Sequence, residues 1–271
     1  MNEIQIACNT SPWGPDGVIP AMNAIRNAGF GGIECPASVV SRYEDRLHVF
    51  EEILEREGLC LAGLVQPLDI MDRDKADEQV ERAVNVARFA AAAGHGYLVV
   101  CQVDPVAQPP DEDGWITAAA VLEEVGVRCR KGGVALCFMP VARPLEMDEK
   151  ALDRLMAMTP PDAVNLALDT AESFWAGTDI ARMAKKHAAR LKVVRFRDAP
   201  GSSRRGARGQ AVSTPAFGRG AVRFEALSKA LKDMDYSGWI TLDVSGEAQD
   251  PKAAVANGFR GLMRKAGLLD P

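Results

Sequence analysis

The fold class of this chain is best indicated by residues 163–199, AVNLALDTAESFWAGTDIARMAKKHAARLKVVRFRDA. Two runs within this stretch, at 163–169 and 191–197, are mostly apolar at successive positions, as is typical of strands buried on both faces. Each run ends in polar residues, and a helix-length segment at 179–188 lies between them. A strand, a helix and a second strand in this order predict a βαβ unit with parallel strands.

The same alternation extends in both directions along the 271 residues. Strands are predicted at 4–8, 31–35, 60–65, 97–102, 133–139, 163–169, 191–197 and 239–244. Helices are predicted at 18–28, 43–57, 75–93, 115–131, 148–158, 179–188, 223–234 and 251–266. Glycines such as Gly29 and Gly58 follow helices just before the next strand. Eight such units in a chain of this length predict an α/β fold, a single (β/α)8 TIM barrel, with an open doubly wound sheet as the alternative.

No linker or break in composition divides the chain, so residues 1–271 are expected to form one domain. The one unusual stretch is a long Arg-rich loop at 199–222, which follows the seventh strand and contains Arg204, Arg205, Arg208 and Arg219. Loops after the last strands of such barrels often bind phosphate, and these arginines predict recruitment of a phosphate or carboxylate group. The alternatives are a solvated loop and a contact between subunits.

Composition excludes several classes of protein. With 47% hydrophobic and 25% charged residues the chain is an ordinary globular protein, and its net charge of −5 disfavours binding to nucleic acid. No apolar run is long enough to span a membrane, and the acidic Glu3 stands where a signal peptide would be basic, so we expect a cytoplasmic protein. The six cysteines form no CxxC pair and predict neither a zinc knuckle nor a redox motif.

In a barrel of this kind the chemistry lies at the C-terminal ends of the strands. Polar or otherwise notable side chains at those ends are Asn9, Glu34, Gln66, Gln102, Asp104, Met139, Arg143, Asp169, Glu172, Arg195, Arg197, Asp198 and Asp243. We expect a group of them to bind substrate: Glu34, Gln102, Met139, Arg143, Arg197 and, from the long loop, Arg219. The aromatic residues Trp13, Phe174, Trp175 and Phe217 fall near the same end and would suit an apolar or ring-bearing ligand.

Four segments resemble the xylose isomerase-like superfamily of TIM barrels, which includes sugar phosphate isomerases and epimerases, inosose dehydratases and tagatose epimerases. They are AMNAIRNAGFGGIE at 21–34, LALDTAESFWAGTDI at 166–180, LKVVRFRDA at 191–199 and FGRGAVRFEALSKALKDMDYSGWITLD at 217–243. The resemblance implies an isomerase, an epimerase or a β-eliminating lyase that removes a proton next to a carbonyl. It also implies a small-molecule substrate, a homo-oligomer, and one divalent ion held by Glu, Asp, His and Glu from strands five to eight.

This chain departs from the metal-ligand pattern that the resemblance implies. The four ligand positions align with Met139, Asp169, Arg195 and Asp243, and the family's histidine in the sixth loop aligns with Glu172. A thioether is a poor ligand for Mg²⁺ or Mn²⁺, and arginine has no lone pair to donate to a metal. The three histidines, His48, His95 and His187, fall away from the strand ends. We therefore expect no metal cofactor, although Asp169 and Asp243 would be ligands if Mn²⁺ or Mg²⁺ did bind.

Three interpretations remain open at this point. In the first, Asp169, Glu172, Arg195 and Asp243 are catalytic: the guanidinium takes over the electrostatic role of the metal, and the carboxylates act as acid and base. In the second, the same residues form an inert network of ion pairs in a non-catalytic ligand-binding barrel or a partner subunit. In the third, the protein is a metal enzyme that uses Asp169, Asp243 and a ligand elsewhere.

Overall fold

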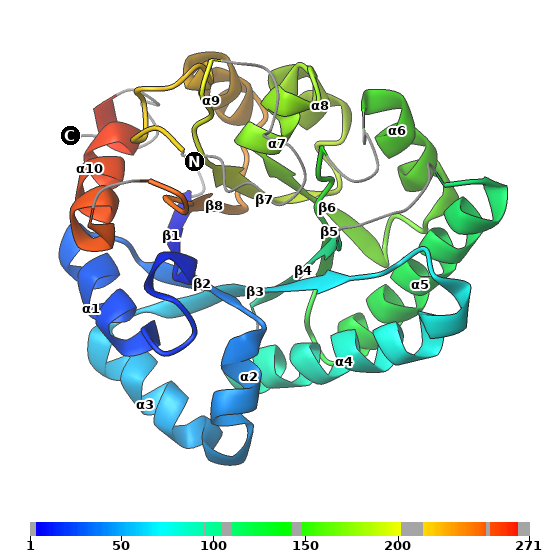
Figure 1. Cartoon of the computed structure of the whole chain (residues 1–271), viewed down its shortest axis with the longest axis horizontal. Helices are drawn as coiled ribbons and strands as arrows, with labels where there is room; N and C mark the ends of the chain where they lie inside the picture. Colours follow the sequence, from blue (N-terminus) through cyan, green and yellow to red (C-terminus); the bar gives the residue numbers. More distant parts are fainter. Residues whose placement is uncertain are drawn as a thin grey trace.

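The computed structural model describes residues 4–94, 96–103, 110–142, 148–201, 214–247 and 250–264. Its parallel strands form a closed barrel in chain order, and the last strand pairs with the first (Figure 1). The strands are β1 (Gln5–Asn9), β2 (Gly32–Pro36), β3 (Cys60–Leu68), β4 (Tyr97–Gln102), β5 (Leu136–Phe138), β6 (Val164–Asp169), β7 (Leu191–Phe196) and β8 (Trp239–Leu242). The (β/α)8 TIM barrel predicted from the sequence is confirmed.

The helices surround the barrel on its outside (Figure 1). They are α1 (Val18–Ala28), α2 (Ser38–Tyr43), α3 (Leu47–Glu57), α4 (Ala76–Ala92), α5 (Glu112–Lys131), α6 (Glu149–Met158), α7 (Thr170–Trp175), α8 (Ile180–Lys186), α9 (Phe224–Asp233) and α10 (Pro251–Arg264). Short 3-10 turns lie at η1 (Ser11–Trp13), η2 (Glu44–Arg46) and η3 (Arg73–Lys75). None of the described helices is both long and apolar enough to cross a membrane.

Several element boundaries differ from the prediction. The fifth strand, predicted at 133–139, spans 136–138; Gly133 has a φ of 78°, which is not extended, so the strand does not begin there. The range 43–57, predicted as one helix, holds the last residue of α2, the turn η2 and helix α3. Helix α7 was not predicted at all.

The core has two parts. Most apolar side chains fill the space between the barrel and the helices, and Phe50, Phe138 and Phe196 are among the largest that are fully buried. A smaller apolar cluster fills the barrel itself and consists of Val99, Cys101, Cys137, Met139, Ala167 and Val193. Ala167 on β6 and Val193 on β7 belong to this apolar floor, and side chains two apart share a face of a strand, so positions 169 and 195 are the next inward-facing ones toward the C-terminal ends.

Candidate functional site

The inward-facing positions above the floor are charged. Asp169 follows Ala167 by two residues on β6, and Arg195 follows Val193 in the same way on β7. Since side chains two apart share a face of a strand, both side chains point into the barrel. Asp169 is fully buried, and Arg195 is 7% exposed.

Six side chains form what we call the buried charge cluster: Glu34, Asp169, Glu172, Arg195, Arg197 and Asp243. Within it Arg195 lies among three carboxylates. Its Nη2 donates to Glu34 Oε2 at 2.6 Å, while Nη1 lies 4.0 Å from Asp169 Oδ2 and 3.8 Å from Asp243 Oδ2. Arg195 thus stands between the two aspartates without hydrogen bonding to either.

Arg197 makes the second set of ion pairs in the cluster. Its Nη2 donates to Glu172 Oε1 at 2.7 Å and lies 3.2 Å from Asp169 Oδ2. The guanidinium carbon lies 5.2 Å from the centre of the Trp175 ring, a distance at which a cation–π contact is favourable. Trp175 therefore supports the orientation of Arg197 from the side of α7.

Backbone N–H groups hold the carboxylates in place. Asp169 Oδ1 accepts from the N–H groups of Ala171 at 2.9 Å and Glu172 at 3.0 Å, and this cap explains why α7 begins directly after β6. Asp243 Oδ1 accepts in the same way from Ser245 at 2.8 Å. Asp169 Oδ2, by contrast, is buried and accepts no hydrogen bond from the described residues. One oxygen of Asp169 is therefore fixed, and the other faces Arg195 and Arg197.

The Glu34 side chain is held by two residues, Asn9 of β1 and Arg195 of β7. Asn9 Nδ2 donates to Glu34 Oε2 at 2.6 Å, and Asn9 Oδ1 accepts from the Ser11 N–H at 2.8 Å. The strand-end rule places Asn9 and Glu34 in the site, but nothing in the sequence predicted that Glu34 would pair with Arg195. The two residues are 161 positions apart, and only closure of the barrel brings them together.

The surroundings move the pKa values of the carboxyl groups apart. Burial raises the pKa of Glu34 although Arg195 acts to lower it, and burial raises the pKa of Asp169 against the effect of Arg197. Burial also acts to raise the pKa of Asp243, but Arg195 and Arg197 outweigh it and lower the pKa overall. Carboxyl groups whose pKa values are driven apart in one site can serve as proton carrier and fixed charge.

Several residues predicted to bind substrate have other contacts in the structure. Gln102 Oε1 accepts from the Ile70 N–H at 3.0 Å, and its Nε2 donates to Asp69 Oδ1 at 2.9 Å, so its amide holds the connection after β3. Met139 is buried in the apolar floor, and Arg219 is exposed. Arg143 lies outside the described residues. Substrate contacts by these four residues stay predictions.

The aromatic residues expected near the mouth of the barrel do not form one group. Phe217 packs against Phe224, with ring centres 4.5 Å apart, and against Phe196 in the outer core. Phe217 therefore packs in the outer core rather than facing the pocket. Trp175, by contrast, contacts Arg197 of the buried charge cluster.

The base of the long loop after β7 is fastened to Asp198. Its Oδ2 accepts from the N–H groups of Gly218 at 2.9 Å and Gly220 at 2.7 Å, and its Oδ1 accepts from Ala199 at 2.8 Å and Val222 at 3.3 Å. A Cβ on Gly220 would lie 2.3 Å from Asp198 Oδ1, so the approach requires glycine. Residues 202–213, with Arg204, Arg205 and Arg208, lie outside the described residues.

Replacing Asp198 by asparagine is expected to lower the free energy of unfolding by about 2 kcal/mol, because each carboxylate oxygen accepts from two N–H groups and an NH₂ group in place of either oxygen would face two donors. Urea unfolding followed by tryptophan fluorescence measures this change. The matched control is Asp179→Asn, since Asp179 caps α8 through one N–H bond to Arg182 and asparagine caps helices equally well. An equal loss of unfolding free energy in Asp198→Asn and Asp179→Asn would contradict the conclusion that Asp198 fastens the base of the loop.

Comparison with known proteins identifies the family. A model of the family described as xylose isomerase-like TIM barrel matches residues 22–265. The chain belongs to the xylose isomerase-like TIM barrel family. Among the relatives, the inosose dehydratase of Geobacillus kaustophilus is 25% identical over 223 residues, which cover 74% of this chain and 71% of that protein.

Solved structures of the xylose isomerase-like fold superpose closely on this chain. The 3-keto-D-glucoside 4-epimerase YcjR from E. coli, in its apo form, has a TM-score of 0.78 at 16% identity and covers 96% of this chain and 99% of its own. The IOLI protein with a binding zinc atom has a TM-score of 0.80 at 14% identity and covers 99% of this chain and 100% of its own. At these identities the structures show a shared fold.

The divalent ion that membership of the xylose isomerase-like family implies does not fit the residues present here. Arg195 Nη1 stands 4.0 Å and 3.8 Å from the two aspartates, in the space where a cation between them would be, and it has no lone pair to offer. Met139 is buried in an apolar cluster. Within the described ranges no three His, Cys, Asp or Glu side chains are arranged to hold a metal ion.

Proposed function

We propose that this chain is an isomerase, epimerase or dehydratase that removes a proton next to the carbonyl of a sugar-like substrate without a divalent metal. The observation that carries the proposal is the place of Arg195, between Asp169 and Asp243 at the C-terminal end of the barrel. Relatives named inosose dehydratase support the reaction class, and the donor chemistry of the cluster supports the absence of a metal.

The guanidinium of Arg195 would stabilise the negative charge that develops on the substrate oxygen. Its Nη1 is farther than a hydrogen bond from both aspartates, so it keeps N–H donors for that oxygen. A fixed cation in a buried site lowers the energy of an enediolate because it needs no reorganisation during the reaction. Glu34 and Asn9 hold Arg195 in this orientation from the opposite side.

Asp169 would be the base. Its Oδ1 is fixed by two backbone N–H groups, and its Oδ2 is buried with no hydrogen bond from the described residues, so Oδ2 is the oxygen that can accept a proton. Its raised pKa suits a base that must also release the proton again. Glu172, held by Arg197, would be the second acid or base, and Asp243 with its lowered pKa would stay charged.

The charge of the cluster favours an uncharged polyol with a ketone over an anion at the reacting end. Four carboxylates face two guanidiniums, and a phosphate placed among them would meet unfavourable charge. A carboxylate or phosphate elsewhere on the substrate would have to extend away from the cluster, toward the loop that carries Arg219. The names of the relatives, which refer to inosose and to a 3-keto-glucoside, agree with a cyclic ketone.

The second candidate is a barrel that binds a ligand, or a partner subunit, without turnover. The pairing of Arg195 with Glu34 and of Arg197 with Glu172 favours this alternative, because buried ion pairs also persist for structural reasons. Under this alternative a sugar-like ligand would bind at the same strand ends, and no bond of the ligand would change.

Exchange of the substrate proton next to the ketone distinguishes the metal-free enzyme from the non-catalytic barrel. Protein treated with a chelator and desalted is incubated in D₂O with inosose or a 3-keto-glucoside, and NMR follows the signal of the proton next to the ketone. We expect exchange or elimination at a rate that chelator leaves unchanged. Activity that appears only after Mn²⁺ or Co²⁺ is added would contradict the metal-free mechanism. Ligand binding without exchange would favour the non-catalytic barrel.

A further inference from the structure

Glu34, on β2, has one carboxyl oxygen that is held by hydrogen bonds and one that is not. Its Oε2 accepts from Asn9 Nδ2 and from Arg195 Nη2, both at 2.6 Å. Its Oε1 accepts no hydrogen bond from the described residues, yet it is not among the enclosed atoms that lack a partner, as Asp169 Oδ2 is. The Glu34 side chain is thus fixed through one oxygen, and the other is open to a ligand at the strand ends.

A proton on the Glu34 carboxyl group would stand on Oε1, because two N–H groups already point at Oε2. The surroundings favour such a proton. Glu34 is only 1% exposed, and its burial raises the pKa of the carboxyl group although Arg195 acts to lower it. The negative charge of Asp243 acts in the same direction as burial. Glu34 therefore has the features of a neutral acid whose proton is on its open oxygen.

Arg195 lies between this acid and the proposed base. Its Nη2 donates to Glu34, and Nη1 of the same planar guanidinium lies 4.0 Å from Asp169 Oδ2. A substrate whose ketone oxygen is bound by Arg195 would therefore lie near one group that can take a proton and one that can give a proton. Elimination of water requires both, since a proton leaves one carbon and a hydroxyl group leaves the next.

Glu172 is less suited to give a proton to a leaving group. Its Oε1 accepts from Arg197 Nη2 at 2.7 Å, and its Oε2 accepts from the Ala142 N–H at 2.9 Å. Both oxygens of Glu172 are therefore engaged by the protein, whereas Glu34 has Oε1 for a proton and a substrate. Of the two glutamates, Glu34 is the one whose contacts suit an acid.

We propose that Glu34 is a catalytic acid, which passes a proton from Oε1 to the leaving hydroxyl group of the substrate as water departs. The inference rests on the proposed function and selects elimination of water among its reactions. Glu34 then has two roles: Oε2 holds Arg195, and Oε1 assists the carbon–oxygen bond that breaks.

The elimination needs no co-reactant. Asp169 takes the proton from the carbon next to the ketone, and the electron pair moves onto the ketone oxygen beside Arg195. When the carbonyl group forms again, a double bond joins the carbon that lost its proton to the next carbon. The bond from that next carbon to its hydroxyl group breaks, and the Glu34 proton completes the water. A proton then passes from Asp169 to Glu34 through solvent, so the substrate loses one water and the protein is unchanged.

The test compares exchange of the proton next to the ketone with loss of water. Glu34→Gln keeps an oxygen for Asn9 and Arg195 and has the shape and neutrality of the protonated acid, but its NH₂ group does not give up a proton. With inosose in D₂O, NMR measures both the exchange and the dehydrated product. We expect the variant to exchange the proton within about threefold of wild type, because Asp169 performs that step, and to lose water about 10²-fold or more slowly.

A better leaving group should remove the need for the acid. In inosose with fluorine in place of the leaving hydroxyl group, fluoride departs without a proton, and a fluoride electrode measures its release. Glu34→Gln should release fluoride within about tenfold of wild type, which also shows that the variant is folded. Glu34→Asp keeps a carboxyl group and should recover part of the loss of water from inosose.

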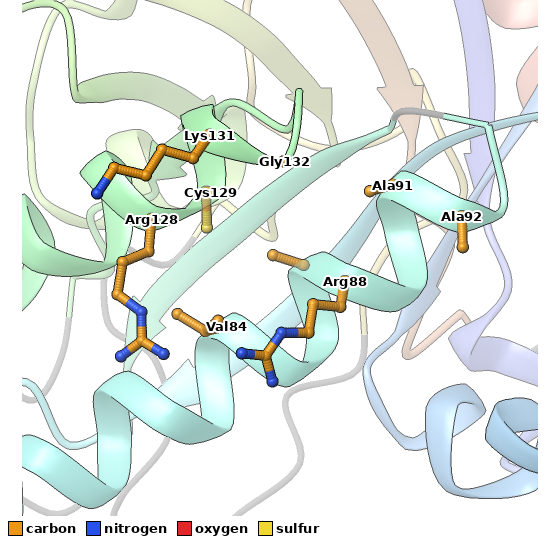
Figure 2. Close-up of a pocket in the computed structure, with 9 residues that line it drawn as sticks. Val84, Arg88, Ala91, Ala92, Arg128, Cys129, Lys131 and Gly132 are labelled. Atoms are coloured by element: carbon orange, nitrogen blue, oxygen red, sulfur yellow. The ribbon is translucent and has the colours of Figure 1, made fainter.

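Two control variants lie away from the strand ends. Glu57→Gln removes another buried carboxyl group, at the end of α3, where Glu57 is 8% exposed and pairs with Arg56 at 3.1 Å. Arg88→Gln changes the wall of a hollow of about 660 Å³ on the outer surface, which is lined mostly by α4 and α5 and is shown in Figure 2. Both controls should exchange the proton and lose water as the wild type does.

Three results would overturn the acid role of Glu34. The first is exchange without loss of water in the wild type, which would leave the proposed function standing. The second is equal slowing of fluoride release and water loss in Glu34→Gln. The third is exchange without loss of water in Glu172→Gln and not in Glu34→Gln. Wild-type protein that shows neither reaction would contradict the proposed function itself, and the acid role of Glu34 with it.

Discussion

Asp169→Asn is expected to lower kcat by about 10²–10⁴-fold on the cyclic ketone identified by proton exchange, which is the range for loss of a general base. Asparagine has the same shape, and its oxygen can still accept from the N–H groups of Ala171 and Glu172. The new NH₂ group would stand where Oδ2 does and cannot accept a proton. Steady-state kinetics measures the change, with KM expected to move much less than kcat.

The pH profile distinguishes loss of a base from damage to the site. Burial raises the pKa of Asp169 above its ordinary value of 3.8, so kcat of the wild type should fall as pH falls through that raised value. The residual activity of the variant should lack this fall. Asp179→Asn, at the N-terminus of α8, is the control and should leave kcat unchanged. A variant of Asp169 within about tenfold of wild type would contradict its role as base.

The fold was predictable because it depends on local pattern. Apolar runs that are buried on both faces, such as 163–169 and 191–197, and the helical segments between them define βα units wherever they occur in the chain. The boundaries were less predictable, because they depend on single residues: the φ of 78° at Gly133 keeps that residue out of β5, and the side chain of Asp169 caps the start of α7.

The sequence predicted which residues come together in the buried charge cluster, but not which of them form ion pairs. The strand-end rule brings Asp169, Arg195 and Asp243 together, and in the structure Arg195 Nη1 lies 4.0 Å from Asp169 Oδ2 and 3.8 Å from Asp243 Oδ2. The pairing of Arg195 with Glu34 and of Arg197 with Glu172 depends on how far each side chain reaches across the closed barrel. Periodicity in the sequence carries no information about that reach.

Arg195→Met is expected to lower the free energy of unfolding by about 3–5 kcal/mol, the usual cost of removing one partner from a buried ion pair. Methionine fills a similar volume, so the loss would come from charge rather than from a cavity. Glu34, Asp169 and Asp243 would be left buried with Arg197 as the remaining cation of the cluster. Urea unfolding at pH 7 measures the loss, and the exposed pair Arg130–Asp162 provides Arg130→Met as a control that should change stability little.

The loss in Arg195→Met should be larger at pH 8 than at pH 5. Burial already raises the pKa of Glu34 in the folded protein, so the folded state binds more protons than the unfolded one and stability falls as pH rises through that region. Removing Arg195 takes away the charge that opposes this rise, so the pKa of Glu34 goes up further and the fall in stability steepens. Adding Glu34→Gln should recover part of the loss at pH 8, because the amide has no charge to bury. A loss that is the same at both pH values, or no recovery in the double variant, would mean that Arg195 stabilises the barrel by packing, and the electrostatic role proposed for it in catalysis would then lack its physical basis.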